Sequence, residues 1–338
     1  MKNKNFRNAL LLLLVTGVIL YFSLKDDFRT VLNEILSINI FWLVIGVLLL
    51  LGYWFLEAVI LHKLSQNFKK NYSFYKAFRV QVICQFFSAV TPFASGGQPF
   101  QLYAMKKDKF TYGEATSIVV QQFILYQIAL VLIGIFALIY NRLFNLYPKV
   151  EILQNLVALG FVINAFVIVF LILLAYSKKF DRFIFKFGIN FLYFIKVVKD
   201  KGSTIERWNK KIEDFTEGAK ILTKNKKEFI YMIIISIFSL ISLYLTPCVI
   251  LYGMGDYNSV TPIVTIVSSA YVMLVGSFVP IPGGTGGIEF GFASFFGNFI
   301  KGPILPALLL VWRFITYYMV VIFGSIFVNL KGKEEKCE

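Results

Sequence analysis

Long apolar runs alternate with short basic loops along the chain. Each uninterrupted run is long enough to cross a bilayer as a helix, which takes about 20 apolar residues. A transmembrane β-barrel is excluded because its strands alternate apolar and polar positions, whereas these runs are continuously apolar. The pattern therefore predicts an all-α polytopic membrane protein with about six full transmembrane helices. The predicted spans are 7–24, 40–61, 115–140, 152–176, 229–252 and 304–329.

Glycine and proline interrupt two further apolar runs, 77–104 and 261–300. The first breaks at Thr91-Pro92-Phe93-Ala94-Ser95-Gly96-Gly97-Gln98-Pro99, and the second at Pro280-Ile281-Pro282-Gly283-Gly284-Thr285-Gly286-Gly287. Basic loops stay in the cytoplasm, and by this rule the first run begins and ends inside and the second outside. We therefore predict two re-entrant helical hairpins that enter from opposite faces. The alternative to the second hairpin is an ordinary span over 261–279 followed by a surface loop of glycines.

The distribution of positive charge places both termini in the cytoplasm. The order span–hairpin–span occurs over 40–140 and, inverted, over 229–329, which predicts one transmembrane domain over 1–338 built as an inverted repeat, a plan of many transporters. The basic segment 177–228 is expected inside, as an amphipathic helix in the headgroup layer or as a helix packed on the bundle. The terminal basic residues are Lys2, Lys4, Arg7, Lys331, Lys333 and Lys336.

Composition narrows the possible functions. The net charge is +15, but the basic residues lie in loops between apolar runs, so we expect them to meet lipid headgroups rather than nucleic acid. The three cysteines are far apart and there is one histidine, so we predict no metal site, cofactor or catalytic residue. The basic and then apolar N-terminus resembles a signal peptide, yet it lacks a small-residue cleavage site, which favours an uncleaved first span.

The two breaks are candidate sites for a lipid headgroup. Non-helical backbone is tolerated at membrane depth only where protein or a water-filled cavity satisfies it. The N-terminus of a half-helix also offers free N–H groups and a partial positive charge that attract phosphate. Close helix packing is the alternative explanation for the glycines. The candidate ligands are Ser95, Gly96, Gly97 and Gln98 in the first break, and Gly283, Gly284, Thr285, Gly286 and Gly287 in the second.

Charged residues inside the apolar runs give a second signal, because an ionised side chain at mid-bilayer costs about 2.5–3.5 kcal/mol on insertion scales. Glu289 follows the second glycine run, and Arg313 lies near the middle of the last span. These two are expected either to form a structural pair or to bind lipid, with Arg313 holding a phosphate through its planar fork and Glu289 orienting it. Arg79, at the mouth of the first hairpin, is another candidate headgroup contact.

Other polar residues in the spans have more than one interpretation. Glu57 is expected near the cytoplasmic end of its span, beside His62 and Lys63, as an interfacial group rather than a proton carrier. The glutamines are expected either to line a polar groove or to hold helices together. They are Gln81, Gln85, Gln121, Gln122 and Gln127.

Over nearly the whole chain, these motifs resemble the transmembrane region of lysylphosphatidylglycerol synthase, which is also found alone in flippase-like proteins. In this family, Gly-Glu and a nearby Arg often follow the first break, where this chain has Gln98-Pro99 and Gln101, so the charges of the first site are expected to differ. The resemblance rests on Thr91-Pro92 through Gly96-Gly97 to Lys106-Lys107, on Pro282-Gly283-Gly284-Thr285-Gly286-Gly287-Ile288-Glu289, which is the more specific motif, and on Arg313.

The resemblance implies a flippase-like lipid translocator of the cytoplasmic membrane. Its cargo would be a phospholipid, including aminoacylated phosphatidylglycerol, or a lipid-linked precursor, and a separate lipid-modifying enzyme would be a partner. The alternative is a phosphatidylglycerol lysyltransferase-type enzyme or subunit, linked to resistance to cationic peptides and antibiotics. Because the sequence ends soon after the last span, we expect it to lack the soluble transferase domain and to need a soluble partner. A scaffold for lipid-synthesis enzymes is a third interpretation.

Overall fold

The computed structural model describes residues 28–147, 151–177, 225–276 and 279–334, together with three single positions between 180 and 190. Within these residues the fold is all-helical, as the apolar runs predict. The predicted span 7–24 and most of segment 177–228 lie outside the described residues. Five helical segments are long and apolar enough to cross a membrane, and each overlaps a predicted span: Ile40–Gln66, Tyr112–Phe144, Asn155–Leu173, Lys226–Gly253 and Ile304–Val328.

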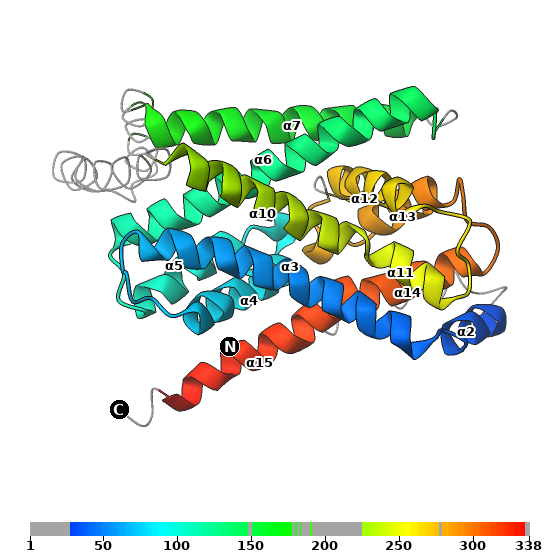
Figure 1. Cartoon of the computed structure of the whole chain (residues 1–338), viewed down its shortest axis with the longest axis horizontal. Helices are drawn as coiled ribbons and strands as arrows, with labels where there is room; N and C mark the ends of the chain where they lie inside the picture. Colours follow the sequence, from blue (N-terminus) through cyan, green and yellow to red (C-terminus); the bar gives the residue numbers. More distant parts are fainter. Residues whose placement is uncertain are drawn as a thin grey trace.

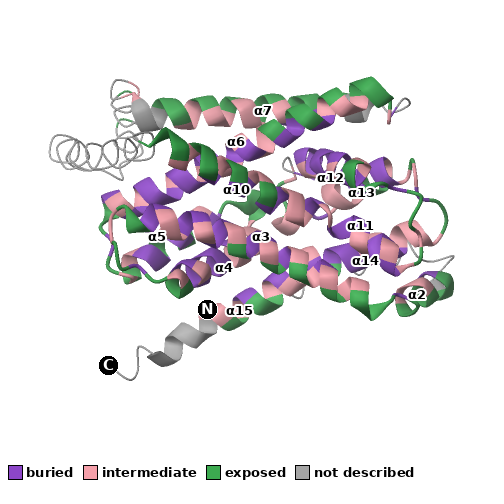
Figure 2. Ribbon diagram, viewed as in Figure 1, coloured by how far each residue is buried: buried purple, intermediate pink, exposed green. Residues whose placement is uncertain are grey.

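Three long helices form the centre of the bundle. These are α3 (Ile40–Gln66), α6 (Tyr112–Phe144) and α10 (Lys226–Tyr244), and each contacts the other two (Figure 1). Helix α7 (Glu151–Tyr176) packs on α6 along one side of the bundle and is less buried than the central helices (Figure 2). Helix α11 (Thr246–Gly253) follows α10 after a single non-helical residue.

The sequence defines the ends of these helices through local hydrogen bonds. At the start of α6, the Thr111 hydroxyl accepts a hydrogen bond from the Glu114 N–H, and the Glu114 carboxylate accepts one from the Thr111 N–H. This reciprocal arrangement satisfies two donors that an α-helix leaves unpaired. The Asn39 side chain caps α3 in a similar way. Pro247 lies in the first turn of α11, where its missing N–H costs nothing.

Two helix pairs are each divided by a non-helical break. Helices α4 (Phe74–Val90) and α5 (Gly97–Lys107) flank the first break and pack against each other, and α12 (Pro262–Gly276) and α13 (Gly287–Phe296) do the same at the second. The first pair lies at one end of the bundle and the second toward the opposite end (Figure 1). Helix α12 has 15 residues, about 22 Å at 1.5 Å per residue, so it is shorter than a full span.

The two breaks contact each other. Each contains a short 3₁₀ turn, η1 (Pro92–Ala94) or η2 (Pro282–Gly284), and these turns contact each other. η2 also contacts α4. The described part of the second glycine run therefore packs against the first hairpin.

The last membrane segment changes its helical geometry part-way along. It begins as α14 (Ile304–Arg313), passes through the π-helical turn η3 (Phe314–Tyr318) and continues as α15 (Met319–Glu334). Helix α2 (Phe28–Leu36) packs on α14, and α15 packs on α4. The π turn follows directly after Arg313.

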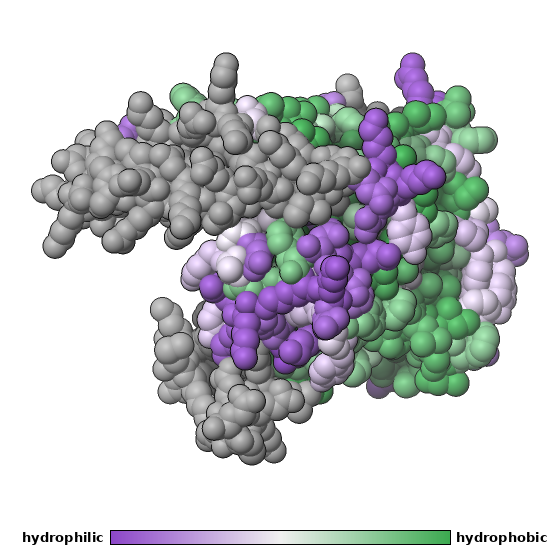
Figure 3. Space-filling model, turned by 60° about the vertical axis from the view of Figure 1, so that its left-hand side comes forward, coloured by the Kyte–Doolittle hydropathy of each residue, from purple (hydrophilic) through white to green (hydrophobic). Residues whose placement is uncertain are grey.

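The outer surface of the described residues separates by polarity. With the left end of Figure 1 turned forward, Figure 3 shows hydrophilic groups on that end and hydrophobic groups on the side wall. Large apolar side chains such as Leu48, Phe55 and Phe166 are exposed on the helices that are long enough to span a membrane. This distribution is that of a multi-pass membrane protein, since a lipid-facing wall needs no polar groups.

Candidate functional site: a polar cavity where two broken hairpins meet

A cavity of about 520 Å³ lies between the first hairpin and the central helices. We call it the polar cavity, because its wall carries many uncharged polar groups and one carboxylate. Aromatic rings from α3 and α6, among them Tyr53, Trp54 and Tyr126, form another part of the wall. The polar lining residues are Glu57, Gln81, Gln85, Ser88, Ser95, Gln98, Gln101, Gln122 and Thr316.

A network of side-chain hydrogen bonds centred on Gln122 crosses one wall of the polar cavity. The Gln101 amide donates to the Gln122 side-chain oxygen at 2.7 Å. The Gln122 amide nitrogen lies 3.0 Å from Glu57 Oε2 and 3.1 Å from the side-chain oxygen of Gln81. The Ser239 hydroxyl donates to Glu57 Oε1 at 2.7 Å. The network thus connects α3, α4, α5, α6 and α10, and buried polar groups connected in this way help to fix how helices pack.

The expectation that Glu57 is an interfacial group is wrong. Its exposed fraction is only 2%, and it lies within the network described above. The predicted span ended at Leu61, but α3 continues to Gln66. Glu57 is therefore nine residues, about 13 Å, from the end of the helix.

The predicted polar groove is present, but only some of the candidate glutamines line it. Gln81, Gln85 and Gln122 line the polar cavity, whereas Gln121 and Gln127 are not among its lining residues. Gln121 donates instead to the Ser117 hydroxyl on its own helix. In the same network the glutamines also hold helices together, so both interpretations apply.

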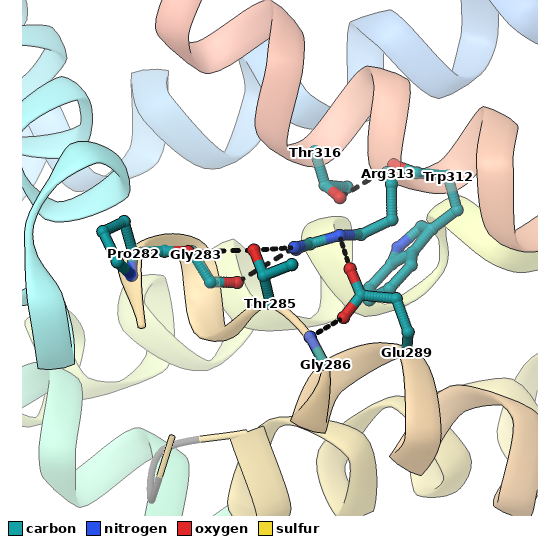
Figure 4. Close-up of polar contacts among 8 residues, drawn as sticks. All are labelled: Pro282, Gly283, Thr285, Gly286, Glu289, Trp312, Arg313 and Thr316. Atoms are coloured by element: carbon teal, nitrogen blue, oxygen red, sulfur yellow. Dashed lines mark hydrogen bonds and ion pairs between the residues drawn. The ribbon is translucent and has the colours of Figure 1, made fainter. Parts of the chain in front are cut away.

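The second break holds a buried ion pair (Figure 4). Arg313 Nε lies 2.7 Å from Glu289 Oε1, so the pairing that the sequence indicated is present. One terminal nitrogen of Arg313 donates to the Gly283 carbonyl at 3.1 Å and to the Thr285 hydroxyl at 3.4 Å. The guanidinium also lies over the Tyr317 ring, 4.7 Å from its centre. Gly283, Thr285, Gly286, Glu289 and Arg313 form what we call the Arg313 cluster.

Glu289 also caps the helix that follows the second break. Its Oε2 accepts a hydrogen bond from the Gly286 N–H at 2.6 Å, at the N-terminus of α13. A carboxylate is favoured there because the helix dipole leaves partial positive charge at that end. The same carboxylate pairs with Arg313. Charge at the second break is thus balanced within the protein.

The two breaks share one backbone plan. Ser95 donates to the Pro92 carbonyl at 2.8 Å, and Thr285 donates to the Pro282 carbonyl at 2.9 Å. The residue before each proline is extended, as the proline ring requires. Two residues with positive φ follow each proline, and a pair of glycines opens the next helix. Aligned in this way, the motifs are Pro92-Phe93-Ala94-Ser95-Gly96-Gly97 and Pro282-Gly283-Gly284-Thr285-Gly286-Gly287.

The two breaks have different side chains at equivalent backbone positions. Positive φ is easy for Gly283 and Gly284 but strained for Phe93 and Ala94, whose φ angles are 54° and 53°. At the N-terminus of α5 the neutral Thr91 hydroxyl accepts from the Gly96 N–H at 2.8 Å, whereas at α13 the Glu289 carboxylate accepts from the equivalent Gly286 N–H. The first break therefore leaves the positive end of a helix beside the polar cavity without a carboxylate to balance it.

Close packing also explains some of the glycines, as the alternative interpretation proposed. A Cβ atom on Gly97 would collide with the Ser88 side chain and crowd the backbone of α4. A Cβ atom on Gly283 would collide with the ring of Tyr317. These two positions therefore require glycine for steric reasons, whether or not a ligand binds.

Arg79 lies away from both breaks. It lies in the second turn of α4, and 12 residues, or about 18 Å of helix, separate it from Thr91. Its side chain pairs with Asp108 at 2.9 Å, and the Tyr72 hydroxyl donates to the same carboxylate. Burial and the nearby Asp108 carboxylate raise the pKa of Tyr72 well above its ordinary value. A headgroup role for Arg79 thus remains a prediction, at a place separate from the polar cavity.

The structure divides the predicted site residues into two adjoining groups. Ser95 and Gln98 line the polar cavity, while Gly283, Thr285, Gly286, Glu289 and Arg313 form the Arg313 cluster. Thr316, one turn after Arg313, lines the polar cavity and connects the two. Sequence reasoning missed the aromatic residues Tyr53, Trp54 and Tyr126. Nothing in their local sequence distinguishes them from other apolar positions in a span.

Similarity to known proteins agrees with this architecture. The profile of the lysylphosphatidylglycerol synthase TM region matches residues 8–324. The chain belongs to this family. Lysylphosphatidylglycerol synthase TM-region proteins are therefore its relatives, and the resemblance expected from the two glycine motifs is confirmed.

Two curated proteins are similar over most of their length. A UPF0104 membrane protein of Archaeoglobus fulgidus is 22% identical over 294 residues, which cover 85% of each chain. The Uncharacterized protein MG306 homolog of Mycoplasma pneumoniae is 23% identical over 329 residues, or 89% of this chain and 80% of that one. The name of the first relative describes a membrane protein, and neither name gives a substrate.

Proposed function

We propose that this protein is a flippase-like translocator that moves a phospholipid or a lipid-linked precursor between the leaflets of the cell membrane. Aminoacylated phosphatidylglycerol is one candidate cargo. The observation that carries the proposal is the polar cavity, which is lined by the first broken hairpin, next to its contact with the second, in a bundle with apolar walls. A headgroup in such a cavity stays among polar groups while its acyl chains remain in the bilayer.

The proposed topology has six full spans and two re-entrant hairpins, with both termini in the cytoplasm. Halves 40–140 and 229–329 would form an inverted repeat, and their shared break motif and meeting tips support this arrangement. Inverted repeats with broken helices place the substrate near the bilayer midplane in many transporters. The basic segment 177–228 would lie at the cytoplasmic headgroups.

Within this function, the first break binds the headgroup and the second supports it. The N-terminus of α5, which no carboxylate neutralises, and the Gln98 amide offer positive potential and donors to a lipid phosphate, and Ser95 would add a donor if its hydroxyl left the Pro92 carbonyl. Arg313 is held by Glu289 and by the backbone of the second break, so it would contact lipid only if that pair opened.

Purified protein in liposomes that contain a fluorescently labelled phospholipid tests this function. We expect the protein to accelerate leaflet exchange above that of empty vesicles, and Ser95→Trp, which fills the cavity from its wall, to abolish the gain. Ser37→Trp is a matched control, since Ser37 is exposed at the end of α2. Exchange no faster than in empty vesicles would refute the proposal. Formation of aminoacyl lipid by the same protein with charged tRNA would instead identify a transferase.

A further inference from the structure

Glu57 carries the one carboxyl group among the residues that line the polar cavity. The proposed binding of a lipid headgroup does not use it. Glu57 lies on α3, and its hydrogen-bond partners Gln122 and Ser239 come from α6 and α10, the two other central helices. An ionisable residue at such depth in a membrane protein normally serves a pathway for ions or protons or has a charged partner. The negative charge of this carboxylate therefore needs a cation or a bound proton to neutralise it.

The hydrogen bonds around Glu57 are too few to compensate a full charge. The Ser239 hydroxyl has one proton, and both Glu57 Oε1 at 2.7 Å and the Ser236 carbonyl at 2.8 Å are within reach of it. The Gln122 amide has two protons but three acceptors, since it also lies 3.2 Å from the Glu57 carbonyl. An ionised carboxylate must therefore compete for the Ser239 and Gln122 protons, which leaves the neighbouring Ser236 hydroxyl as its one uncontested donor, whereas a protonated carboxyl group needs fewer donors.

The side chains that line the cavity include no cation among the described residues. The ionisable groups that face Glu57 are Tyr53 on α3, Cys84 on α4 and Tyr126 on α6, which are all neutral as acids. From α5, α10 and η3 the lining side chains are Gln98, Gln101, Leu243 and Thr316. No lysine, arginine or histidine is among the described lining residues of the cavity.

Cations on the elements packed around Glu57 are engaged elsewhere. Lys63 on α3 lies over the ring of Tyr231, and Arg79 on α4 is paired with Asp108. Arg313 is paired with Glu289. An uncompensated buried charge costs several kcal/mol, so the carboxyl group is expected to bind a proton whenever no other cation is present.

The cavity can hold the water that carries a proton to and from this group. A volume of about 520 Å³ exceeds many times the roughly 30 Å³ of one water molecule. Polar groups on the cavity wall, among them Gln85, Ser88 and Gln98, give such water hydrogen-bond partners.

We propose that Glu57 is a proton-exchange site, and that its protonation couples lipid movement through the polar cavity to the pH difference across the membrane. One proton binds to the carboxylate from water on one side, and the same proton leaves to water on the other side when the cavity changes its access. The coupling rests on the proposed translocation, whereas the proton site itself does not. The pH difference would then supply the driving force for lipid movement without nucleotide hydrolysis.

Infrared spectroscopy of the reconstituted protein tests the site without any transport. We expect a carboxylic-acid carbonyl band that disappears as pH rises and that is missing in Glu57→Gln. Glu114→Gln is the matched control, because glutamine preserves the α6 capping box and Glu114 does not line the cavity. In Ser239→Ala, which removes a donor to the ionised form, the band should persist to higher pH. A band that Glu57→Gln leaves unchanged would overturn the proposal.

Lipid exchange under an imposed pH difference tests the coupling. Wild-type protein should move labelled lipid several-fold faster in one direction than in the other, and Glu57→Gln should move it equally in both. A response to a sodium gradient but not to pH would overturn the proton assignment. A titrating Glu57 band in a protein that moves no lipid would refute the translocation function and leave the proton site standing. Circular dichroism and size-exclusion profiles equal to wild type would establish that each variant is folded.

Discussion

The first and second breaks follow the same backbone plan and handle charge in opposite ways. At the second break, Arg313 and Glu289 neutralise each other, and the carboxylate also caps the helix that follows. At the first break the corresponding helix is capped only by the neutral Thr91 hydroxyl, and it begins beside a polar cavity. A repeated motif can thus serve as a closed structural joint in one copy and as an open binding surface in the other.

The largest effect is expected from Arg313→Ala, which leaves the partly buried Glu289 carboxylate without its charged partner. We expect a loss of about 3–5 kcal/mol in unfolding free energy, the usual cost of an unpaired buried charge. Arg79→Ala in α4 should cost less, since Asp108 still accepts from Tyr72 and keeps Lys69 nearby. Thermal unfolding in detergent measures both variants. Equal losses would contradict a special role for the Arg313–Glu289 pair in stability.

A double variant separates structure from lipid contact at the second break. Arg313→Met with Glu289→Gln removes both charges and should recover most of the stability, because a neutral pair needs no compensation. If the cluster is only a joint, lipid exchange should recover as well. Restored stability without exchange would show that Arg313 contacts the cargo.

The next largest effect is expected from Gly283→Ala. The new Cβ would meet Tyr317 and adopt a φ of 66°, which together should cost about 2–4 kcal/mol. Gly255→Ala is the matched control, because Gly255 also has positive φ but has open space around its Cβ position. The difference between the two unfolding free energies isolates the contact with Tyr317. No difference would mean that the second break is loosely packed.

A smaller effect is expected from Gln122→Leu beside the first break. The change removes hydrogen bonds to Glu57, Gln81 and Gln101, and it should cost about 1–2 kcal/mol, the upper part of the range for bonds between membrane helices. Gln85→Leu, which loses a single bond to Tyr53, should cost about 0.6 kcal/mol. Denaturation in mixed micelles would compare them. An equal cost for both would argue against a connected network.

The smallest expected effect has the opposite sign. Ala94→Gly relieves positive φ at the first break and should stabilise the protein by about 0.5 kcal/mol, the difference between the strain of alanine and the added chain entropy of glycine. Ala129→Gly, in the middle of α6, should instead destabilise by about 1 kcal/mol. If Ala94→Gly also destabilised the protein, the strain at the first break would be absent.

Local signals in the sequence were enough for the helices and the breaks. Apolar length predicts a spanning helix, and proline with paired glycines predicts where a helix is interrupted, so both breaks fall at the predicted residues. The pairing of Glu289 with Arg313 was one of two expected outcomes, because a charge in an apolar run needs a partner. A direct comparison of the residues after Pro92 with those after Pro282 would also have revealed the motif that the two breaks share.

The cavity could not be predicted, because its wall joins residues that are distant along the chain. Tyr53, Gln101 and Thr316 come together only when three separate elements pack. The depth of Glu57 was misjudged for a local reason. His62 and Lys63 suggested the end of a span, but their flexible or half-buried side chains allow α3 to continue for another turn.

The π-helical turn between α14 and α15 has one further consequence. A π turn accommodates one more residue than an α turn, and each residue advances an α-helix by about 100°. The extra residue therefore resets the angular phase of everything after it. Arg313 faces the second break from one side of this reset, and Val320 faces the polar cavity from the other. Deleting Tyr318, for example, would keep Arg313, Thr316 and Tyr317. It would still rotate Val320 relative to Arg313 and so misalign one of these two faces.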